Sequence, residues 1–403
     1  MREMVPLEEA RQILMKTVKP LEVVEMDLLK AVGLVLAKDI IAPRPFPPFD
    51  RSPLDGFAFR SVDTTRASAE NPVKLYITET IYAGHAAKGR VEPGTAAGIA
   101  TGAPIPPGAD CVARFEDTRQ EGQYVIIYKP FRQDENIIQA GEEIAGGELA
   151  LPAGQELNPP AVATLAALGY TKVPVYRRPR VSIFSTGDEL LPLGRPLLPG
   201  KIYNSNLYAI AAQVAEAGGE AVLQENAGDD EELVGKQFIK GLDMADLVIS
   251  TGGVSVGKRD VVKKAMESAG AELLFWKVAC KPGKPVTCGL RESRLLIGLS
   301  GNPAAATVMF TLLVRPLLRL MSGRRELYLP RVQARLAEDL PKGGKMRSFI
   351  RAVVRWQDGY VAWPVGKKGR GMLKSLAEGN ALIDIPEKHG FVKTGDSIEV
   401  LLL

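Results

Sequence analysis

Histidine is scarce in this 403-residue chain, which contains only His85 and His389. So few histidines argue against Ser-His-Asp catalysis and against a zinc site rich in histidine. Any acid–base or metal chemistry therefore falls to carboxylates and lysines.

Cysteine is also sparse. Cys111, Cys280 and Cys288 form no CxxC metal motif and no paired disulfide framework. A reducing compartment is the simpler interpretation. The opening residues, MREMVPLEEARQILMK, are charged and lack the apolar segment of a signal peptide. We therefore expect a cytoplasmic protein.

Neither sign of charge predominates, because the formal net charge is only +4. The chain has no basic tail or stripe, which argues against nucleic-acid binding. One run of 20 uncharged residues, between Arg294 and Arg315, is long enough to cross a bilayer. Glycine, asparagine and proline interrupt this run, so it predicts a buried strand, turn and helix, and we expect no membrane contact.

The length predicts several domains. From about 175 to 325, strands alternate with helices, which predicts a doubly wound parallel sheet. Residues 55–139 show short alternating runs and predict a mostly β domain. The five prolines of 42–53 predict an extended connection. Short runs between glycine turns in 326–403 predict a small β-barrel.

The expected boundaries can be stated by residue number. Residues 1–20 and 174–325 form the doubly wound domain, 21–47 and 140–173 a linking domain, 48–139 the mostly β domain, and 326–403 the barrel. Open parallel sheets bind ligands at the carboxyl ends of their strands. The motifs described next lie at such ends.

A glycine-rich loop, TGGVSVGKRD (251–260), follows an apolar strand and opens a helix. Gly252, Gly253 and Gly257 allow the backbone amides to approach an anion closely. The loop nearly matches a P-loop, but Arg259 stands where a serine or threonine would hold magnesium. A nucleotide hydrolase and a tight turn that binds nothing are both open alternatives for this motif alone.

Acidic residues follow three neighbouring strands. Asp188 and Glu189 end one, Asp229 and Asp230 end the next, and Asp260 closes the glycine loop. Carboxylate oxygens and water are suitable ligands for Mg²⁺. Each residue alone is better explained as a helix cap or a solvated side chain. Their common location favours a shared metal site.

Lysines gather around the prolines of KPGKP (281–285), which Lys277 precedes. Proline fixes the backbone, so the ammonium groups of Lys281 and Lys284 can hold set positions for a phosphate or an oxyanion. An exposed basic turn is the alternative interpretation.

The turn SGNPAAA (300–306) places Asn302 and Pro303 at the start of a helix. This helix start either binds an anion or is simply well capped. Together the motifs predict a polyanionic ligand with a divalent ion, without identifying the ligand.

Seven motifs occur in one order along nearly the whole chain: SPLDGFAFR, ATGAPIPPGAD, GEEI, STGDEL, TGGVSVG, KPGKP and SGNPAAA. This order resembles the molybdopterin molybdenumtransferases, a family that includes the C-terminal part of gephyrin. TGGVSVG is shared with the smaller molybdopterin adenylyltransferases. The LDGFA and TGAPIPPGAD segments lie outside that shared domain and indicate the transferase.

The resemblance implies an enzyme that accepts adenylylated molybdopterin and molybdate. It would cleave the phosphoanhydride with Mg²⁺, release AMP and leave molybdenum on the dithiolene. It implies an elongated homodimer whose active site lies between one subunit's doubly wound domain and the other's β domain. A molybdopterin adenylyltransferase and the maturation proteins of molybdenum enzymes are the other partners it suggests.

The resemblance also implies roles for individual residues. The catalytic residues would be Asp55, Thr101, Glu189, Asp229 and Asp260, the first two from the opposing subunit. The metal ligands would be Glu143, Glu189, Asp229 and Asp260. The substrate- and oxyanion-binding residues would be Gly252, Gly253, Ser255, Gly257, Lys277, Lys281, Lys284, Asn302, Pro303 and Arg347.

Three positions depart from the family pattern. Ser300 replaces a common proline, Lys258 a usual acidic residue, and Arg370 a common serine. A tungstate-preferring enzyme and an inactive or regulatory paralogue are therefore alternatives. An adenylyltransferase would need only the doubly wound domain, and a scaffold would need a recruitment tail or long linker that this sequence does not contain.

Overall fold

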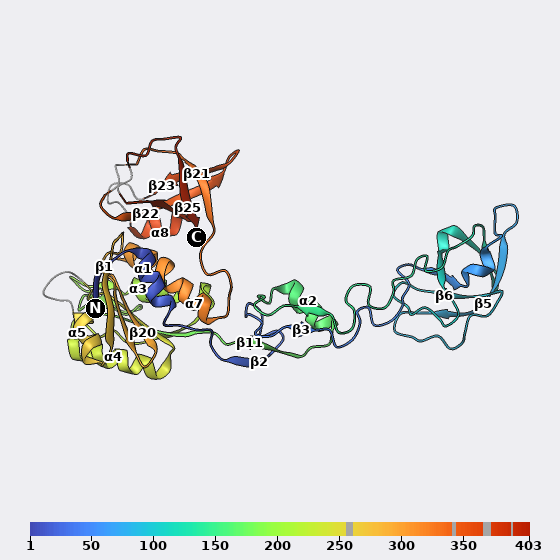
Figure 1. The fold of residues 1–403 in the computed structure, drawn as a ribbon, viewed down its shortest axis with the longest axis horizontal. Helices are drawn as coiled ribbons and strands as arrows, with labels where there is room; N and C mark the ends of the chain where they lie inside the picture. Colours follow the sequence, from blue (N-terminus) through green and yellow to red (C-terminus); the bar gives the residue numbers. More distant parts are fainter. Residues whose placement is uncertain (255–260, 341–343, 366–371, 388–389) are drawn as a thin grey trace.

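The computed structural model describes residues 1–254, 261–340, 344–365, 372–387 and 390–403. Figure 1 shows an elongated molecule. An α/β domain and a barrel stand at one end, a β domain stands at the other, and a narrow linking region joins them. The chain passes through the linking region twice, on its way to the β domain and on its way back.

A seven-stranded sheet is the centre of the α/β domain. Its strands, in spatial order, are β1 (Arg2–Val5), β17 (Glu272–Val278), β19 (Thr287–Arg291), β20 (Arg294–Leu299), β16 (Leu247–Thr251), β12 (Arg180–Ser185) and β15 (Glu220–Leu223). Six strands run parallel to one another, while β19 is antiparallel to both of its neighbours. The doubly wound fold is confirmed, with one antiparallel strand that the sequence pattern did not predict. A tight turn at Glu292 and Ser293, both with positive φ, joins β19 to β20.

Helices cover both faces of this sheet. One face packs against α1 (Leu7–Met15), α3 (Ser205–Glu216), α6 (Pro303–Met309) and α7 (Arg315–Met321), and the other against α4 (Glu231–Met244) and α5 (Val261–Ser268). A π-helical stretch, Phe310–Val314, joins α6 to α7. The helical run Pro303–Met321 is apolar and long enough to cross a membrane, but 72% of that segment is buried. Its interpretation as a core element of the domain is confirmed.

The linking region has its own small core. Strand β2 (Val23–Asp27) pairs with β11 (Lys172–Tyr176), and β3 (Ile40–Ile41) pairs with β10 (Leu149–Leu151). Helix α2 (Pro159–Ala167) packs beside them and is capped by Asn158. Leu36, Leu157 and Leu165 are fully buried there, so the region is a folded unit and not a loose connection.

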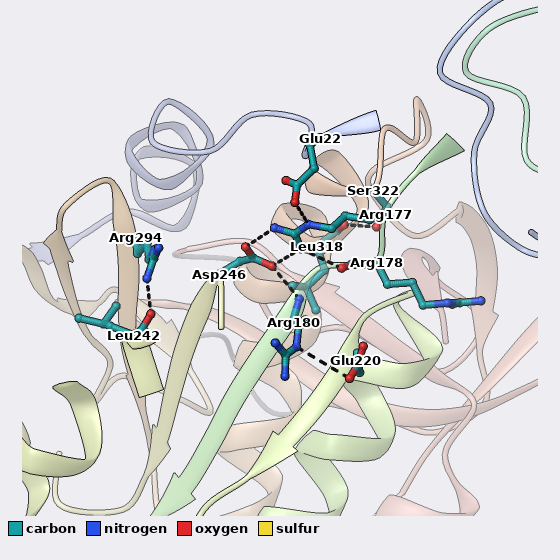
Figure 2. Close-up of polar contacts among 10 residues, drawn as sticks. All are labelled: Glu22, Arg177, Arg178, Arg180, Glu220, Leu242, Asp246, Arg294, Leu318 and Ser322. Carbon is teal, nitrogen blue, oxygen red and sulfur yellow. Dashed lines mark hydrogen bonds and ion pairs between the residues drawn. The ribbon is translucent and has the colours of Figure 1, made fainter. Parts of the chain in front are cut away.

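Arg177 fixes the point at which the linking region leaves the α/β domain (Figure 2). Its guanidinium donates to both carboxylate oxygens of Asp246, at 2.6 and 2.7 Å, and also to Glu22. Asp246 further accepts from the backbone N–H of Arg180 at 2.8 Å. Partial burial acts to raise the pKa of Asp246, but the Arg177 and backbone hydrogen bonds outweigh it and hold the pKa below its ordinary value. A bidentate pair of this kind is directional, and it joins the segment between β11 and β12 to the residue that precedes β16.

The β domain is a six-stranded sheet. Its order is β7 (Cys111–Arg114), β4 (Gly56–Phe59), β6 (Thr95–Ile99), β5 (Val73–Ile81), β9 (Tyr124–Ile127) and β8 (Thr118–Glu121), with short 3₁₀ turns at Ser61–Thr64 and Phe115–Asp117. Phe57 and Phe59 alternate with Ala58 along β4, so the sheet buries apolar side chains on both faces. The prediction of a mostly β domain is confirmed.

The C-terminal domain is a five-stranded barrel. Its strands are β21 (Arg331–Leu336), β22 (Arg347–Trp356), β23 (Tyr360–Pro364), β24 (Ala381–Ile385) and β25 (Ser397–Leu402). Strand β24 pairs with both β22 and β25, which closes the barrel as predicted. The short strand β18 (Cys280–Lys281), which belongs to the α/β part of the chain, pairs with β22 and so ties the barrel to its neighbour. Helix α8 (Met372–Glu378) completes the domain.

Candidate active site

A cleft of about 370 Å³ opens at the carboxyl edge of the seven-stranded sheet. It lies where β12, β16 and β20 end, which is the place where open α/β sheets bind ligands. Its lining includes Thr186, Glu189, Asn204, Asn206, Asp229, Gly252, Gly253, Ser300 and Pro303. Five residues predicted from the sequence therefore meet in one cleft: Glu189, Asp229, Gly252, Gly253 and Pro303.

The glycine turn after β16 lies in contact with the end of β12. Gly252 and Gly253 both have positive φ, at 92° and 64°. A side-chain Cβ at Gly252 would lie 2.5 Å from the carbonyl oxygen of Thr186, which is too close for any other residue. The turn therefore requires glycine for both its conformation and its packing. Ser255, Gly257 and Asp260 lie outside the described residues.

Glu189 and Asp229 bring two carboxylates to the cleft from the loops after β12 and β15. Among the residues that the structure describes, neither carboxylate has a hydrogen-bond or ion-pair partner. Asp188, next to Glu189, has a structural role, because its carboxylate accepts a hydrogen bond from the backbone N–H of Asp229 at 3.2 Å. Asp188 thus positions the loop, while Glu189 and Asp229 are free to bind a ligand.

Asp230 is the N-cap of α4. Its side chain accepts from the backbone N–H of Leu233 at 2.9 Å. Of the two alternatives for the 229–230 pair, the structure thus assigns the cap to Asp230 and the cleft to Asp229.

Buried polar side chains form the floor of the cleft, and the sequence interpretation did not single them out as site residues. Ser185 donates to the side-chain oxygen of Asn204 at 2.9 Å, so the hydroxyl of Thr251, 2.8 Å away, donates to Ser185. Asn204 also accepts from the backbone N–H of Leu207 and so caps α3. Asn206 donates to the carbonyl of Gly301 at 2.8 Å. The available signal was position, since Ser185 and Thr251 each end a buried strand.

Asn302 caps α6 through its side chain. Its Oδ1 accepts from the backbone N–H groups of Ala304 and Ala305, at 3.0 and 3.3 Å. These two amides therefore already have a partner, which favours the well-capped helix over an anion site at this point. Pro303, the next residue, lines the cleft.

The three predicted lysines differ in burial and in pairing. Lys281 is exposed and Lys284 half-buried on the KPGKP turn, whose Pro285 lines the cleft. Lys277, by contrast, is only 8% exposed, and its ammonium lies 2.9 Å from Glu3 and 3.3 Å from the ring centroid of Trp276. Lys281 and Lys284 lie on the turn that brings Pro285 to the cleft but do not line it themselves, whereas Lys277 is already paired.

Arg347 is also fully engaged. Its guanidinium binds Asp384 in the barrel through two nitrogens and Glu8 on α1 through the third. The hydrogen bond to Asp384 raises the pKa of Arg347 above its ordinary value. In this structure Arg347 joins the barrel to the α/β domain, and it is not part of the cleft lining.

Asp55 and Thr101 meet in the β domain. The backbone N–H and the hydroxyl of Thr101 both donate to Asp55 Oδ1, at 2.7 and 3.0 Å. Glu143 lies at the base of the same domain, 3.7 Å from Arg51. The β domain stands at the opposite end of the molecule from the cleft (Figure 1), so within one chain these residues cannot reach Glu189 and Asp229.

The predicted set of four metal ligands is accordingly not assembled in one chain. Within the described ranges, no three Asp, Glu, His or Cys side chains lie close enough together to hold a metal ion. Glu143 does not line the cleft, and Asp260 lies outside the described residues. Glu189 and Asp229 are the two predicted ligands that share the cleft.

Three family models match successive parts of the chain. The MoeA N-terminal region (domain I and II) matches residues 5–169, a probable molybdopterin binding domain 182–320, and the MoeA C-terminal region (domain IV) 333–403. A molybdopterin molybdenumtransferase from Staphylococcus aureus (strain MRSA252) is 37% identical over 403 residues, covering 100% of this chain and 96% of that protein. The chain belongs to the molybdopterin molybdenumtransferase family.

Two further members of this family are also similar to the chain over nearly its whole length. The enzyme of that name from Bacillus subtilis (strain 168) is 37% identical over 407 residues and covers 100% of this chain and 95% of its own length. The solved molybdopterin biosynthesis MoeA protein from Pyrococcus horikoshii OT3 superposes with a TM-score of 0.84 at 33% identity, covering 99% and 100% of the two chains. As a molybdopterin molybdenumtransferase family member, the chain is a transferase of molybdenum cofactor biosynthesis.

One of the three departures from the family pattern lies in the cleft itself. Ser300 lines it, directly after β20, and its hydroxyl oxygen accepts from the backbone N–H of Asn302 at 3.2 Å. Lys258 and Arg370 lie outside the described residues. The three cysteines are buried and free, and burial raises the pKa of the Cys280 thiol to about 12. None of them is placed to act as a thiolate nucleophile.

Proposed function

We propose that this chain inserts molybdate into adenylylated molybdopterin, with Mg²⁺-dependent cleavage of the phosphoanhydride and release of AMP. The observation that carries the proposal is the cleft at the carboxyl edge of the sheet. It combines the carboxylates of Glu189 and Asp229, which have no partner among the described residues, with the tight glycine turn at Gly252. A phosphoanhydride ligand with a divalent ion needs this combination of oxygen ligands and close backbone approach.

Glu189 and Asp229 fit the role of Mg²⁺ ligands, because both border the cleft and neither is committed to another side chain among the described residues. When bound there, Mg²⁺ would offset negative charge on the phosphoanhydride. Lys281 and Lys284, on the turn that brings Pro285 to the cleft, would attract molybdate and stabilise the leaving phosphate. The hydroxyls and amides of the cleft floor would orient the substrate without a covalent intermediate.

We infer that the working form is a homodimer, because the second half of the predicted site lies too far away in its own chain. Asp55 and Thr101 form a preorganised pair on the β domain. Supplied by a second copy, they would face the cleft of the first. A two-fold axis between the two copies would give the dimer two equivalent sites. A cytoplasmic location and contact with an adenylyltransferase or maturation proteins are further expectations from the sequence.

The alternatives differ in what they require of the chain. An adenylyltransferase alone would use the α/β domain and leave the other domains without a role. A tungstate-preferring enzyme would differ only in oxyanion choice, and an inactive paralogue would bind ligands without turnover. Ser300 in the cleft, together with Lys258 and Arg370, keeps both of these alternatives open.

AMP release from adenylylated molybdopterin tests the proposal directly. The purified protein is assayed with Mg²⁺ and with molybdate, tungstate or neither. We expect AMP release that depends on molybdate. A preference for tungstate would change the assigned metal. The absence of release under all three conditions would contradict the proposal and favour an inactive paralogue.

A further inference from the structure

A second polar cavity, of about 350 Å³, lies between the linking region and the α/β domain. One wall is the loop that leads into α2, with Gly154, Glu156 and Asn158. The other wall is the end of α7 and the segment after it, with Arg319, Arg324 and Arg325. The proposed reaction uses none of these residues.

Arg324 is held in place at this cavity by several hydrogen bonds. Its guanidinium bonds both carboxylate oxygens of Glu156, at 3.0 and 3.1 Å, and the carbonyl of Gly33 at 2.8 Å. It also packs on Gly218, where a Cβ would lie 2.5 Å from its Nη1. Arg324 therefore neutralises Glu156, and the remaining charge of the cavity is carried by its neighbours.

Arg319 and Arg325 have donors left over. Arg319 uses Nε for the carbonyl of Glu326, and Arg325 uses Nη2 for the carbonyl of Ala153 at 2.8 Å. Across the described ranges, their other guanidinium nitrogens have no hydrogen-bond partner. The Gly154 backbone lies against Arg325, since a Cβ there would be 2.6 Å from Nε. The Arg325 side chain is thus held at the cavity although the residue is exposed.

The local charge favours an anion. Arg319, Arg324 and Arg325 face two acids, Glu156 and Glu326, which leaves an excess of one positive charge in the lining. Burial, followed by the nearby charges of Arg315 and Arg324, lowers the pKa of Arg319 below its ordinary value. An anion would relieve this repulsion. The Asn158 amide adds a neutral donor, because its Oδ1 accepts from the Ala161 N–H while its Nδ2 has no partner in the part of the chain that the structure describes.

We propose that this cavity binds a tetrahedral oxyanion of the phosphate class, held by the forks of Arg319 and Arg325 with the Asn158 amide opposite. Planar guanidinium groups match the spacing of oxyanion oxygens and bind them in a bidentate manner. The cavity walls come from two domains, so the bound anion joins the linking region to the α/β domain. The site is distinct from the cleft at the sheet edge, which has no lining residue in common with it.

Titration calorimetry of the full-length protein tests this site, with inorganic phosphate, AMP and molybdate as separate ligands. The variants at this cavity are Arg325→Gln alone and the double variant Arg319→Gln, Arg325→Gln. We expect the double variant to weaken phosphate binding by at least about tenfold, since each lost charge-assisted hydrogen bond accounts for roughly that factor. The single variant should lose part of the affinity and keep the wild-type melting temperature, because Arg325 is exposed.

Two control variants show whether a loss of binding is specific to the arginines of this cavity. Arg119→Gln removes an arginine whose side chain is 70% exposed on the β domain and should leave binding unchanged. The variant Lys281→Gln, Lys284→Gln alters the turn beside the cleft and should retain phosphate binding at the second cavity. Molybdate and AMP also bind the cleft under the proposed function, so only binding that the variant Arg319→Gln, Arg325→Gln loses identifies the ligand of this cavity. The proposal would be overturned if the variant Arg319→Gln, Arg325→Gln bound phosphate with wild-type affinity. It would also be overturned if the wild type bound none of the three anions.

Discussion

Thr101 donates two hydrogen bonds to one carboxylate oxygen of Asp55, although 46 positions separate the two residues. The backbone N–H lies 2.7 Å and the hydroxyl 3.0 Å from this oxygen, while the second oxygen of Asp55 has no hydrogen-bond partner among the described residues. We propose that this pair is one half of a site, whose other half is the cleft of a second copy of the chain.

Removing the hydroxyl of Thr101 tests the role of this pair. Thr101→Val keeps the backbone hydrogen bond but loses the side-chain one, and we expect turnover to fall about tenfold because Asp55 loses one of two restraints. Thr101→Ser keeps the hydroxyl and should stay within about twofold of wild type. AMP release is the measurement. Equal rates for the valine and wild-type proteins would contradict the role.

Asp229 and its neighbour Asp230 form a matched pair for the metal prediction. Asp229→Asn should weaken Mg²⁺ binding by at least about tenfold, because a cleft carboxylate loses its charge. Asp230→Asn should leave Mg²⁺ affinity unchanged and cost at most about 1 kcal/mol of stability, since asparagine also caps helices. Calorimetric titration with MgCl₂ distinguishes them. If both variants bind Mg²⁺ like the wild type, the metal site lies elsewhere.

Gly252 should not tolerate a side chain. Gly252→Ala places a Cβ 2.5 Å from the Thr186 carbonyl at a φ of 92°, so the turn must move and activity should fall roughly 100-fold. Gly270→Ala is the matched control, because its φ is 79° but its nearest atom would be 4.0 Å away. That control should cost about 1 kcal/mol and keep its activity. Unchanged AMP release by Gly252→Ala would show that the turn does not approach the substrate.

The Arg177–Asp246 pair predicts a pH-dependent contribution to stability. The folded-state pKa of Asp246 lies below its ordinary value, so the pair stabilises the protein at neutral pH and loses its effect as pH falls through that lowered pKa. Asp246→Asn should lower the free energy of unfolding by about 2–3 kcal/mol at neutral pH and by much less near about pH 3.

Urea denaturation of the wild type and Asp246→Asn at both pH values measures this difference. Glu22→Gln serves as the control, because Glu22 is 62% exposed in its ion pair with Arg177 and should contribute less than about 1 kcal/mol. A destabilisation by Asp246→Asn that stays constant with pH would contradict the assignment.

The sequence was sufficient for the architecture because strand and helix patterns are local. The alternation over 175–325 predicted the doubly wound sheet, and the short alternating runs predicted the β domain and the barrel. The antiparallel strand β19 was not predicted, because β17, β19 and β20 are consecutive apolar strands whose direction depends on pairing and not on composition. The domain boundaries stay predictions.

The cleft was predictable where residues follow strand ends, as Glu189, Asp229 and Gly252 do. Lys277 and Arg347 behave differently because their partners are remote in sequence. Glu3 takes the ammonium of Lys277, and Asp384 with Glu8 takes the guanidinium of Arg347. No motif around a basic residue can reveal an acid that only the fold brings to it.

The most direct test of the account is complementation between two inactive chains. Asp55→Ala and Glu189→Gln are co-expressed with different tags, and only dimers that carry both tags are purified. A site shared between subunits leaves one intact site of two in each such dimer, so we predict about half of the wild-type AMP release. Dimers of Asp55→Ala with Thr101→Val carry a β-domain change at both sites, so we expect them to release AMP at only about one twentieth of the wild-type rate. Failure of the first mixed dimer to exceed its inactive parents would contradict the central claim that each active site is built from two copies of the chain.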